Sequence, residues 1–473
     1  MNMRRKNTIF TLLINAVLII NMLTVNAFAA EPPDIKAKSG ILIEREMGKV
    51  LYEKNADLKV YPASITKVLT AILFVENIPL DEIIVMGNEV NSVPWDSSKA
   101  GHLPGESILA ENLLRALLIP SGNESACVAA SAVAKKITKN PNMPYEEAEP
   151  FFADLMNKKA NELGATHSNF KNPHGYHDDD HYTSARDIAI ICRAAMEHEA
   201  IAKTVKELEY KGNGAGNKKT GDMKTAEYDW KTTNLLLMDY PYADGIKTGF
   251  TNQAGYCLSA SAAKDGEKLI AIVFGEEEEK ERWADTIDLF DYGFDNYDYE
   301  TIQQKDAVLE AAELYDPKLG ESKTMDMLGE DEFIGYFSKE ELSRIEKEII
   351  YKEHKIAIPE KNEEKDNEEE ASESKIKLLL PIKEGDVLGT ISYKLDNEVI
   401  FKGNIIASRD AEERTFKTDV QYYYRLFIDN AFTLKAIPGW IMIIAVLFLI
   451  ISFFRGIRRR RRRRDLYTLR RRY

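Results

Sequence analysis

Three short motifs combine serine and lysine residues in a pattern that suits acyl transfer. They are Ser64-Ile65-Thr66-Lys67, Ser121-Gly122-Asn123 and Lys247-Thr248-Gly249, in this order along a chain of 473 residues. A serine hydroxyl becomes a nucleophile when a neighbouring group takes its proton, and a lysine can do so once its pKa is lowered. Each motif alone is common, whereas the ordered set predicts a serine acyl-transfer site with lysine as its base.

The first motif lies at the start of an apolar helical pattern. Ser64 is therefore expected where backbone N–H groups gather at a helix start, and Lys67, three residues later, is expected on the same face. Burial and the nearby positive charge of Lys247 would lower the pKa of Lys67. The alternative for this motif alone is a helix-capping serine followed by a surface lysine.

The other two motifs are expected to handle the substrate. Ser121 lies in a turn between two helical patterns, where it can relay a proton to the leaving amine, and Asn123 can hold a substrate carbonyl. Lys247 and Thr248, on an expected edge strand, can hold a carboxylate, while Gly249 permits close backbone approach. The alternatives are an ordinary loop and an ordinary strand lysine.

The motifs resemble those of the D-alanyl-D-alanine carboxypeptidases, the low-molecular-mass penicillin-binding proteins. The resemblance covers about residues 35–295 and includes Asn172-Pro173-His174-Gly175, the segment 181–187 and the segment 254–257. It implies removal of the terminal D-alanine from peptidoglycan stem peptides, in cell-wall biosynthesis and remodelling, with β-lactams as covalent inhibitors.

The resemblance also assigns roles within the site. It implies Ser64 as acyl-ester nucleophile, Lys67 as proton acceptor, Ser121 as active-site serine and Lys247 as substrate binder. The backbone N–H groups of Ser64 and Phe250 would form the oxyanion hole. Phe250 stands where family members often have histidine, so any role of that histidine side chain is lost here.

Two other functions remain open from the sequence. A β-lactamase-type hydrolase needs an added base for the deacylating water, and class A enzymes use a glutamate after the second motif. Glu146, Glu147, Glu149 and Glu162 lie in the stretch that follows that motif and are the candidates considered. The other alternative is a catalytically idle wall-binding or sensor protein, which the intact motifs disfavour.

The elements around the motifs predict an α+β fold. A first hairpin over Gly40–Tyr52 and late strand patterns enclose a run of helices, which favours one antiparallel sheet with a helical lobe, the β-lactamase/transpeptidase-like arrangement. The expected helices are 65–77, 109–118, 124–137, 151–163 and 187–196, with a closing helix near 283–290, and the late strands are 245–248, 256–261 and 269–274.

The rest of the chain divides by composition. We expect a signal peptide at 1–29, the catalytic domain at 30–298, a β-rich domain at 299–416 with an acidic insertion near 361–375, a juxtamembrane segment at 417–436, a transmembrane helix at 437–454 and a cytoplasmic tail at 455–473. Within the β-rich domain, Ser338 and Glu341 form a capping-box pattern that predicts a helix to Ile350.

The two ends predict an exported protein held in a membrane. Residues 1–29 combine basic, apolar and small-residue parts as a signal peptide does; an uncleaved anchor is the alternative. Eleven arginines directly after the apolar segment 437–454 favour a cytoplasmic tail and an extracytoplasmic catalytic domain. The overall formal charge is −14, and residues 455–473 carry eleven arginines and one aspartate, a local charge of +10. The rest of the chain is therefore near −24, so no nucleic-acid partner is expected for the exported part.

No metal or other cofactor is expected. His174, His177 and His181 flank three aspartates, but their spacing is loose and ligand types alone are weak evidence for a metal site. Three cysteines make an odd number in an exported protein, so we expect buried thiols rather than a disulfide framework.

Overall fold

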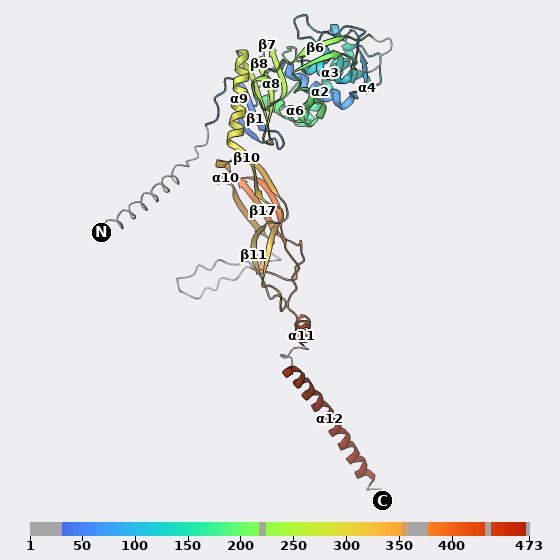
Figure 1. The fold of residues 1–473 in the computed structure, drawn as a ribbon, viewed down its shortest axis with the longest axis vertical. Coiled ribbons are helices and arrows are strands. Elements are labelled where there is room, and N and C mark those ends of the chain that lie inside the picture. Colours follow the sequence, from blue (N-terminus) through green and yellow to red (C-terminus); the bar gives the residue numbers. More distant parts are fainter. Residues whose placement is uncertain (1–30, 217–223, 353–355, 358–376, 431–436, 470–473) are drawn as a thin grey trace, which may run out of the picture. The chain divides into compact units, whose positions relative to one another are not determined.

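The structure is a computed structural model that describes residues 31–216, 224–352, 356–357, 377–430 and 437–469 (Figure 1). The expected signal peptide at 1–29 and the acidic insertion at 361–375 lie outside these residues. The chain forms two compact units that are not continuous in sequence. The first contains residues up to Glu300 together with Gly335–Ser343, and the second contains Thr301–Ile334 and the chain from Arg344 onward.

The first unit is built on a five-stranded antiparallel sheet with the strand order β2-β1-β9-β8-β7. The strands are β1 (Ser39–Glu44), β2 (Val50–Lys54), β7 (Ala243–Thr251), β8 (Gly255–Lys264) and β9 (Glu267–Glu276). The expected first hairpin is thus confirmed, and β1 pairs with the late strand β9 as expected. Strand β7, which carries the third motif, lies at an edge of the sheet.

Side chains that alternate along the strands are buried on both faces of this sheet. Ile270, Ile272 and Phe274 belong to the core shared with the helical lobe, whereas Leu269 and Ala271 belong to a second core that includes residues of α9 (Glu279–Asn296). Successive side chains of a strand point to opposite faces, so a continuous apolar strand is expected between two apolar layers. The sheet is therefore held rigidly, which fixes the position of β7.

The helical lobe lies between the two groups of strands in the sequence. It contains α2 (Lys67–Asn77), α3 (Ala110–Leu118), α4 (Asn123–Thr138), α5 (Tyr145–Leu163), α6 (Ala185–Glu197), α7 (Glu199–Thr204) and α8 (Leu236–Asp239), with the 3-10 turns η1 (Ala63–Thr66) and η2 (Asn88–Asn91). Two small hairpins, β3 (Ile83–Val85) with β4 (Ser107–Leu109) and β5 (Glu209–Asn213) with β6 (Glu227–Lys231), complete it. The main helices agree with the expected ones, and the α+β fold class is confirmed.

Two helices differ from the expected ones. Helix α5 begins at Tyr145, six residues before the expected start, with Pro150 inside it. The helix predicted to run to Ile350 ends at Arg344 as α10 (Lys339–Arg344), and a strand, β14 (Glu346–Tyr351), follows. The capping box itself forms, since Ser338 N donates to Glu341 Oε2 and Glu341 N donates to Ser338 Oγ. Pairing of β14 with β17 outweighs the helical pattern beyond Arg344.

The second unit is rich in strands, as expected. Its seven-stranded sheet has the order β14-β17-β18-β12-β11-β16-β15. The strands not yet given are β11 (Val308–Leu314), β12 (Thr324–Gly329), β15 (Ile356–Ala357), β16 (Lys377–Leu378), β17 (Val387–Leu395) and β18 (Glu398–Ala407), and β10 (Tyr297–Gln303) with β13 (Phe333–Ser338) forms a separate pair.

The segment Gly335–Ser343 belongs to the first unit although the chain around it belongs to the second. Tyr336 is fully buried in the core that contains α9, and its hydroxyl donates to Glu267 Oε2 at 2.9 Å. Lys49 Nζ donates to the carbonyl of Tyr336 at 2.7 Å. This short segment is therefore an integral part of the first unit.

The chain ends in two helices, α11 (Phe416–Asn430) and α12 (Ile437–Leu469). Among the described residues, one helical stretch, Ile437–Arg458, is long and apolar enough to cross a membrane. It contains the expected span 437–454 and fits a single C-terminal membrane anchor.

The three cysteines, Cys127, Cys192 and Cys257, are free and buried, as expected.

Candidate active site

Ser64 lies in the 3-10 turn η1, and α2 begins at Lys67. The expectation that Ser64 begins the α-helix is thus corrected, because the helix begins three residues later and Ser64 lies in the turn before it. The consequence for chemistry is the same, because Lys67 Nζ lies 2.8 Å from Ser64 Oγ. Ala63, directly before the serine, has a φ of 48°, a conformation that L-residues seldom adopt. The serine is therefore presented on a strained turn.

The amine of Lys67 is fully buried and has three partners. It donates to Asn123 Oδ1 at 2.7 Å and to the carbonyl oxygen of His174 at 2.9 Å, and the third partner is Ser64 Oγ. Burial lowers the pKa of Lys67 to about 7 from its ordinary value near 10.5. A large neutral fraction of this lysine therefore exists at physiological pH, as a general base requires.

The expected lowering of the pKa of Lys67 by the charge of Lys247 is not found among the causes of its shift. Burial is the main cause of the low pKa of Lys67, and it also lowers the pKa of Lys247 well below its ordinary value. The positive charge of Lys67 lowers the pKa of Lys247 further. Desolvation therefore lowers the pKa of both lysines, and the charge of Lys67 contributes further only at Lys247.

Ser121 occupies the turn between α3 and α4 with a φ of 63°. Its hydroxyl is buried and has no hydrogen-bond partner among the described residues, although it lines the pocket described below. A buried hydroxyl without a partner costs free energy, and such costs are found where a ligand supplies the partner. Asn123 follows at the start of α4, and its Oδ1 is engaged by Lys67.

The third motif runs along the edge strand β7. Lys247 is fully buried, and its amine donates to the carbonyl oxygen of Thr248 at 3.1 Å. The hydroxyl of Thr248 is 2.7 Å from that of Thr233. A Cβ on Gly249 would lie 3.1 Å from the carbonyl oxygen of Pro62. The glycine thus lets the turn that carries Ser64 approach β7, whereas the sequence pointed to a close approach by substrate.

These residues surround one pocket of about 770 Å³. Its wall brings together residues from all three motifs, namely Ser64, Ser121, Asn123, Thr248, Gly249 and Phe250. Lys67 and Lys247 lie behind this wall, where they are fully buried. The structure thus gathers the predicted site residues into one cavity of the size that small ligands occupy.

The pocket also contains residues that the motifs did not reveal. Arg282, on α9, and Thr233 line its wall. Arg282 is buried, and its guanidinium is 4.3 Å from the ring centroid of Trp283 and 5.3 Å from that of Tyr256. Its Nε has no hydrogen-bond partner in the part of the chain that the structure describes. Arg282 lies near the start of a helix rich in charged residues, so its sequence context does not indicate a role in the site. Its position at the pocket wall becomes apparent only from the fold.

The loop that supplies the His174 carbonyl is packed tightly against α2. Thr70 Oγ1 donates to the carbonyl oxygen of Pro173 at 2.6 Å, and His181 Nε2 is 2.9 Å from Thr66 Oγ1. Gly175 has a φ of 82°, and a Cβ there would lie 1.8 Å from the carbonyl oxygen of Ala63. This position therefore requires glycine, and the loop fixes both η1 and Lys67.

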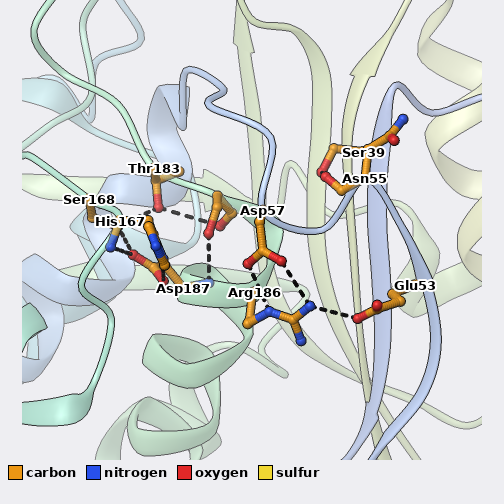
Figure 2. A network of polar contacts seen from close by, with 10 residues as sticks. Ser39, Glu53, Asn55, Asp57, His167, Ser168, Thr183, Arg186 and Asp187 are labelled. Carbon is orange, nitrogen blue, oxygen red and sulfur yellow. Dashed lines mark hydrogen bonds and ion pairs between the residues drawn. The ribbon is translucent and has the colours of Figure 1, made fainter.

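Figure 2 shows how the ends of this loop are held. Arg186 donates to Asp57 at 2.8 Å and to Glu53 at 2.7 Å. Asp187 accepts a hydrogen bond from Ser168 Oγ at 2.6 Å and another from the backbone N–H of His167 at 2.7 Å. The segment 181–187 thus supports the site through structure rather than by contact with the pocket.

The three histidines of the loop make separate contacts. His174 Nδ1 accepts from the backbone N–H of Tyr176, His177 lies edge-on to Tyr61, and His181 contacts Thr66. Burial lowers the pKa of His174 to about 3 and that of His181 to about 4, so both are neutral. Within the described ranges no group of three or more His, Cys, Asp or Glu side chains is placed to hold a metal ion.

A fold of this kind, with a serine and two buried lysines at the edge of an antiparallel sheet, defines a class of serine acyl-transfer enzymes. A family profile described as D-alanyl-D-alanine carboxypeptidase matches residues 26–278, and one described as penicillin-binding protein 5, C-terminal domain, matches residues 297–413. The chain belongs to the D-alanyl-D-alanine carboxypeptidase family, and the resemblance noted from its motifs is confirmed.

Individual relatives agree with this assignment. The chain is 31% identical over 391 residues to D-alanyl-D-alanine carboxypeptidase DacF of Bacillus subtilis, covering 81% of this chain and 88% of that one. It is 28% identical to D-alanyl-D-alanine carboxypeptidase DacA of Escherichia coli over 85% of this chain and 90% of that one. The expectation that the protein is a serine peptidase is thereby confirmed over the β-lactamase-type and idle alternatives.

Solved structures extend the similarity to both units. Penicillin-binding protein 5 from Haemophilus influenzae matches with a TM-score of 0.56 and 25% identity, covering 81% of this chain and all of that one. The Streptomyces K15 DD-transpeptidase matches with a TM-score of 0.52 and 28% identity, over 56% of this chain and all of that one.

Proposed function

We propose that this protein removes the terminal D-alanine from peptidoglycan stem peptides through an acyl-enzyme on Ser64. The observation that carries the proposal is the set of partners around Lys67. A neutral amine has two N–H groups and one lone pair. The oxygen of Asn123 and the carbonyl of His174 can only accept, so they take both N–H groups. The lone pair is left for the hydroxyl hydrogen of Ser64.

The acylation step follows from this arrangement. Ser64 Oγ attacks the carbonyl carbon between the last two D-alanines while Lys67 takes the hydroxyl proton. The negative charge on the carbonyl oxygen is stabilised by the backbone N–H groups of Ser64 and Phe250. When the C–N bond breaks, the leaving amine needs a proton. Ser121, whose hydroxyl is unpaired at the pocket wall, relays it from Lys67, and free D-alanine departs.

Deacylation uses the same base. Water attacks the ester carbon of the acyl-enzyme, and the neutral Lys67 takes a proton from that water. The proton returns to Ser64 Oγ as the ester bond breaks, which releases the shortened peptide and restores the enzyme. Asn123, whose oxygen is held by Lys67, presents its amide N–H groups for the carbonyl of the acyl group.

The terminal carboxylate is held by the third motif with help from Arg282. Thr248 supplies a hydroxyl at the wall, and Lys247 contributes its charge from behind it. Arg282 is the one lysine or arginine among the described residues that line the pocket. A buried carboxylate requires such a cationic partner, because an unpaired charge in a closed site costs several kcal/mol. A β-lactam carries a carboxylate too, so the same residues favour its binding.

The placement of the glutamates supports a peptidase rather than a β-lactamase. The four glutamates considered from the sequence all lie on α5, and none of them lines the pocket. Glu149 accepts a hydrogen bond from Tyr145, and Glu162 lies beside Lys158 and Lys159. None of these four glutamates is therefore placed to act as the base for rapid hydrolysis of a penicilloyl ester, and Glu279, the glutamate that does line the described wall, forms an ion pair with Arg282.

We infer that the catalytic unit lies outside the cytoplasm. An N-terminal signal peptide would export the chain, and the apolar stretch Ile437–Arg458 would hold it in the membrane. The arginines that follow would remain in the cytoplasm by the positive-inside bias. The substrate, peptidoglycan, would then lie on the same side as Ser64.

The full-length protein in detergent tests this function directly. It should release D-alanine from a stem pentapeptide and form a covalent adduct of equal stoichiometry with penicillin, both identified by mass. In Ser64→Ala the adduct should be lost. An adduct of normal stoichiometry in that variant would place the nucleophile elsewhere, and hydrolysis of penicillin at a high turnover number would favour the β-lactamase alternative.

A further inference from the structure

An aromatic pair on the pocket wall has no role in the chemistry described above. Phe250 and Tyr256 face each other across β7 and β8, with ring centroids 4.4 Å apart and an interplanar angle of 34°. Both line the pocket, and Phe250 is 49% exposed. A phenylalanine on a solvated strand position keeps apolar surface in contact with water, and covering it with a ligand would be favourable.

The direction of the substrate places one of its residues over this pair. Strand β7 is an edge strand, to which an extended peptide can add. If Thr248 holds the terminal carboxylate and the N–H of Phe250 receives the scissile carbonyl, the peptide runs from Thr248 towards Phe250. The residue before the D-Ala-D-Ala pair then passes the ring of Phe250. This step rests on the proposed function.

The charges around the pair indicate which side chains it would accept. Arg282 lies beyond Tyr256 and is assigned to the terminal carboxylate. Glu279, also in the lining, is acidic and forms an ion pair with Arg282, with 2.5 Å between Glu279 Oε1 and Arg282 Nη2. A side chain ending in a carboxylate would therefore meet an apolar ring and an arginine whose charge Glu279 already pairs, without a free lysine or arginine among the described lining residues.

We propose that Phe250 and Tyr256 form a subsite for the aliphatic side chain of the residue that precedes D-Ala-D-Ala. This subsite selects side chains with an uncharged end over side chains that end in a carboxylate. The selection arises from coverage of the exposed face of Phe250 by the substrate's methylene groups.

The test uses three acetylated tripeptides that differ in their first residue, which is glycine, norleucine or 2-aminoadipate, followed by D-Ala-D-Ala. We expect native full-length protein to show a kcat/KM for D-alanine release at least about tenfold higher for norleucine than for 2-aminoadipate. In Phe250→Ala the ratio of norleucine to glycine should fall about tenfold, whereas Phe250→Leu, which keeps an apolar side chain, should hold it within about threefold.

Ratios between peptides separate recognition from damage to the fold, because loss of folded protein lowers all three rates alike. An unchanged norleucine-to-glycine ratio in Phe250→Ala would overturn the subsite while leaving the proposed function standing. Equal rates for norleucine and 2-aminoadipate in the native protein would also overturn it. Absence of D-alanine release from all three peptides would overturn the proposed function and this subsite together.

Discussion

Asn123 Oδ1 lies 2.7 Å from Lys67 Nζ, and this contact fixes the orientation of the amide. A lysine amine has no group that an amide N–H could donate to while Ser64 and His174 occupy its other positions, so the oxygen of Asn123 must face it. The nitrogen of the amide then points away from Lys67. One side chain thereby both holds the base in place and leaves its donors for a substrate.

The rate of acylation should depend on pH through Lys67. Its pKa of about 7 lies below the ordinary value of 10.5, so the amine is charged below pH 7 and neutral above it. The neutral form is the base. We expect the rate of penicillin acylation to fall about tenfold per pH unit below 7 and to level off above it. Stopped-flow measurement gives the profile; a flat profile from pH 5 to 9 would exclude Lys67 as the base. Lys67→Arg, which cannot lose its proton near neutral pH, should show almost no acylation at any of these pH values.

Asn123→Asp should move that profile to higher pH. The substitution places a carboxylate against Lys67, and an opposite charge at this distance favours the charged amine. We expect the midpoint to rise by at least about one pH unit and the rate at pH 7 to fall accordingly, with recovery at high pH. The same kinetic measurement checks it. A uniform loss of rate with an unmoved midpoint would mean that Asn123 does not act on Lys67.

Ser121 offers a matched pair of substitutions. Its φ of 63° is costly for alanine and acceptable for glycine, and within the described part of the chain its hydroxyl makes no hydrogen bond that could be lost. Ser121→Gly should therefore be more stable than Ser121→Ala by about 1 kcal/mol, measured by thermal unfolding. Both should slow release of D-alanine by about 100-fold or more, because neither can relay a proton. Near-normal turnover in the stable glycine variant would remove Ser121 from the relay.

Recognition of the terminal carboxylate can be separated from catalysis with an amidated peptide. Arg282→Gln should lower kcat/KM for the free acid about 10- to 100-fold, the effect expected for a hydrogen bond to a charged group, and should affect the amide much less. Lys247→Ala should also lower kcat/KM more for the free acid than for the amide, but by a smaller factor than Arg282→Gln, if the charge of Lys247 acts from behind Thr248. Loss of folded protein would lower acid and amide alike, and so would a role for either residue that is unrelated to the carboxylate.

The orientation of the protein in the membrane can be tested by protease digestion. With trypsin added to intact, wall-stripped cells, the catalytic unit should be digested and a tag placed after Tyr473 should survive, because the arginines after Ile437–Phe454 are expected inside. Lysed cells provide the control, since the tag should be lost there. Loss of the tag in intact cells would reverse the orientation.

The sequence was sufficient for the residues of the motifs and for the sheet that presents them. The continuous apolar run of β9 and the helical periodicity of α2 are local patterns, so they could be recognised without the fold. Arg282 and Thr233 could not be found in this way, because they reach the pocket through contacts between distant segments. The strand β14 was missed for the same reason: Ile349 and Ile350 fit a helix or a strand locally, and only the pairing with β17 decides.

The position of Gly249 shows a second limit. A glycine beside a lysine and a threonine on an edge strand was interpreted as room for substrate. The fold uses that room for the carbonyl of Pro62 and the Cβ of Ala63. A sequence can indicate that a backbone must approach closely, but the identity of the approaching group depends on the tertiary structure.

Because the segment Gly335–Ser343 belongs to the first unit, the two units cannot be separated by a single cut in the sequence. Tyr336 fills a place in the core beside Leu269 and Phe290, and its hydroxyl is bonded to Glu267. A gene fusion or recombination joint placed at residue 300 would deliver a catalytic unit with that place empty. The first unit therefore depends on a segment that the sequence delivers together with the second unit. In chimaeras between relatives, exchange of the chain after Glu300 should be tolerated better when the segment Gly335–Ser343 native to the first unit is kept.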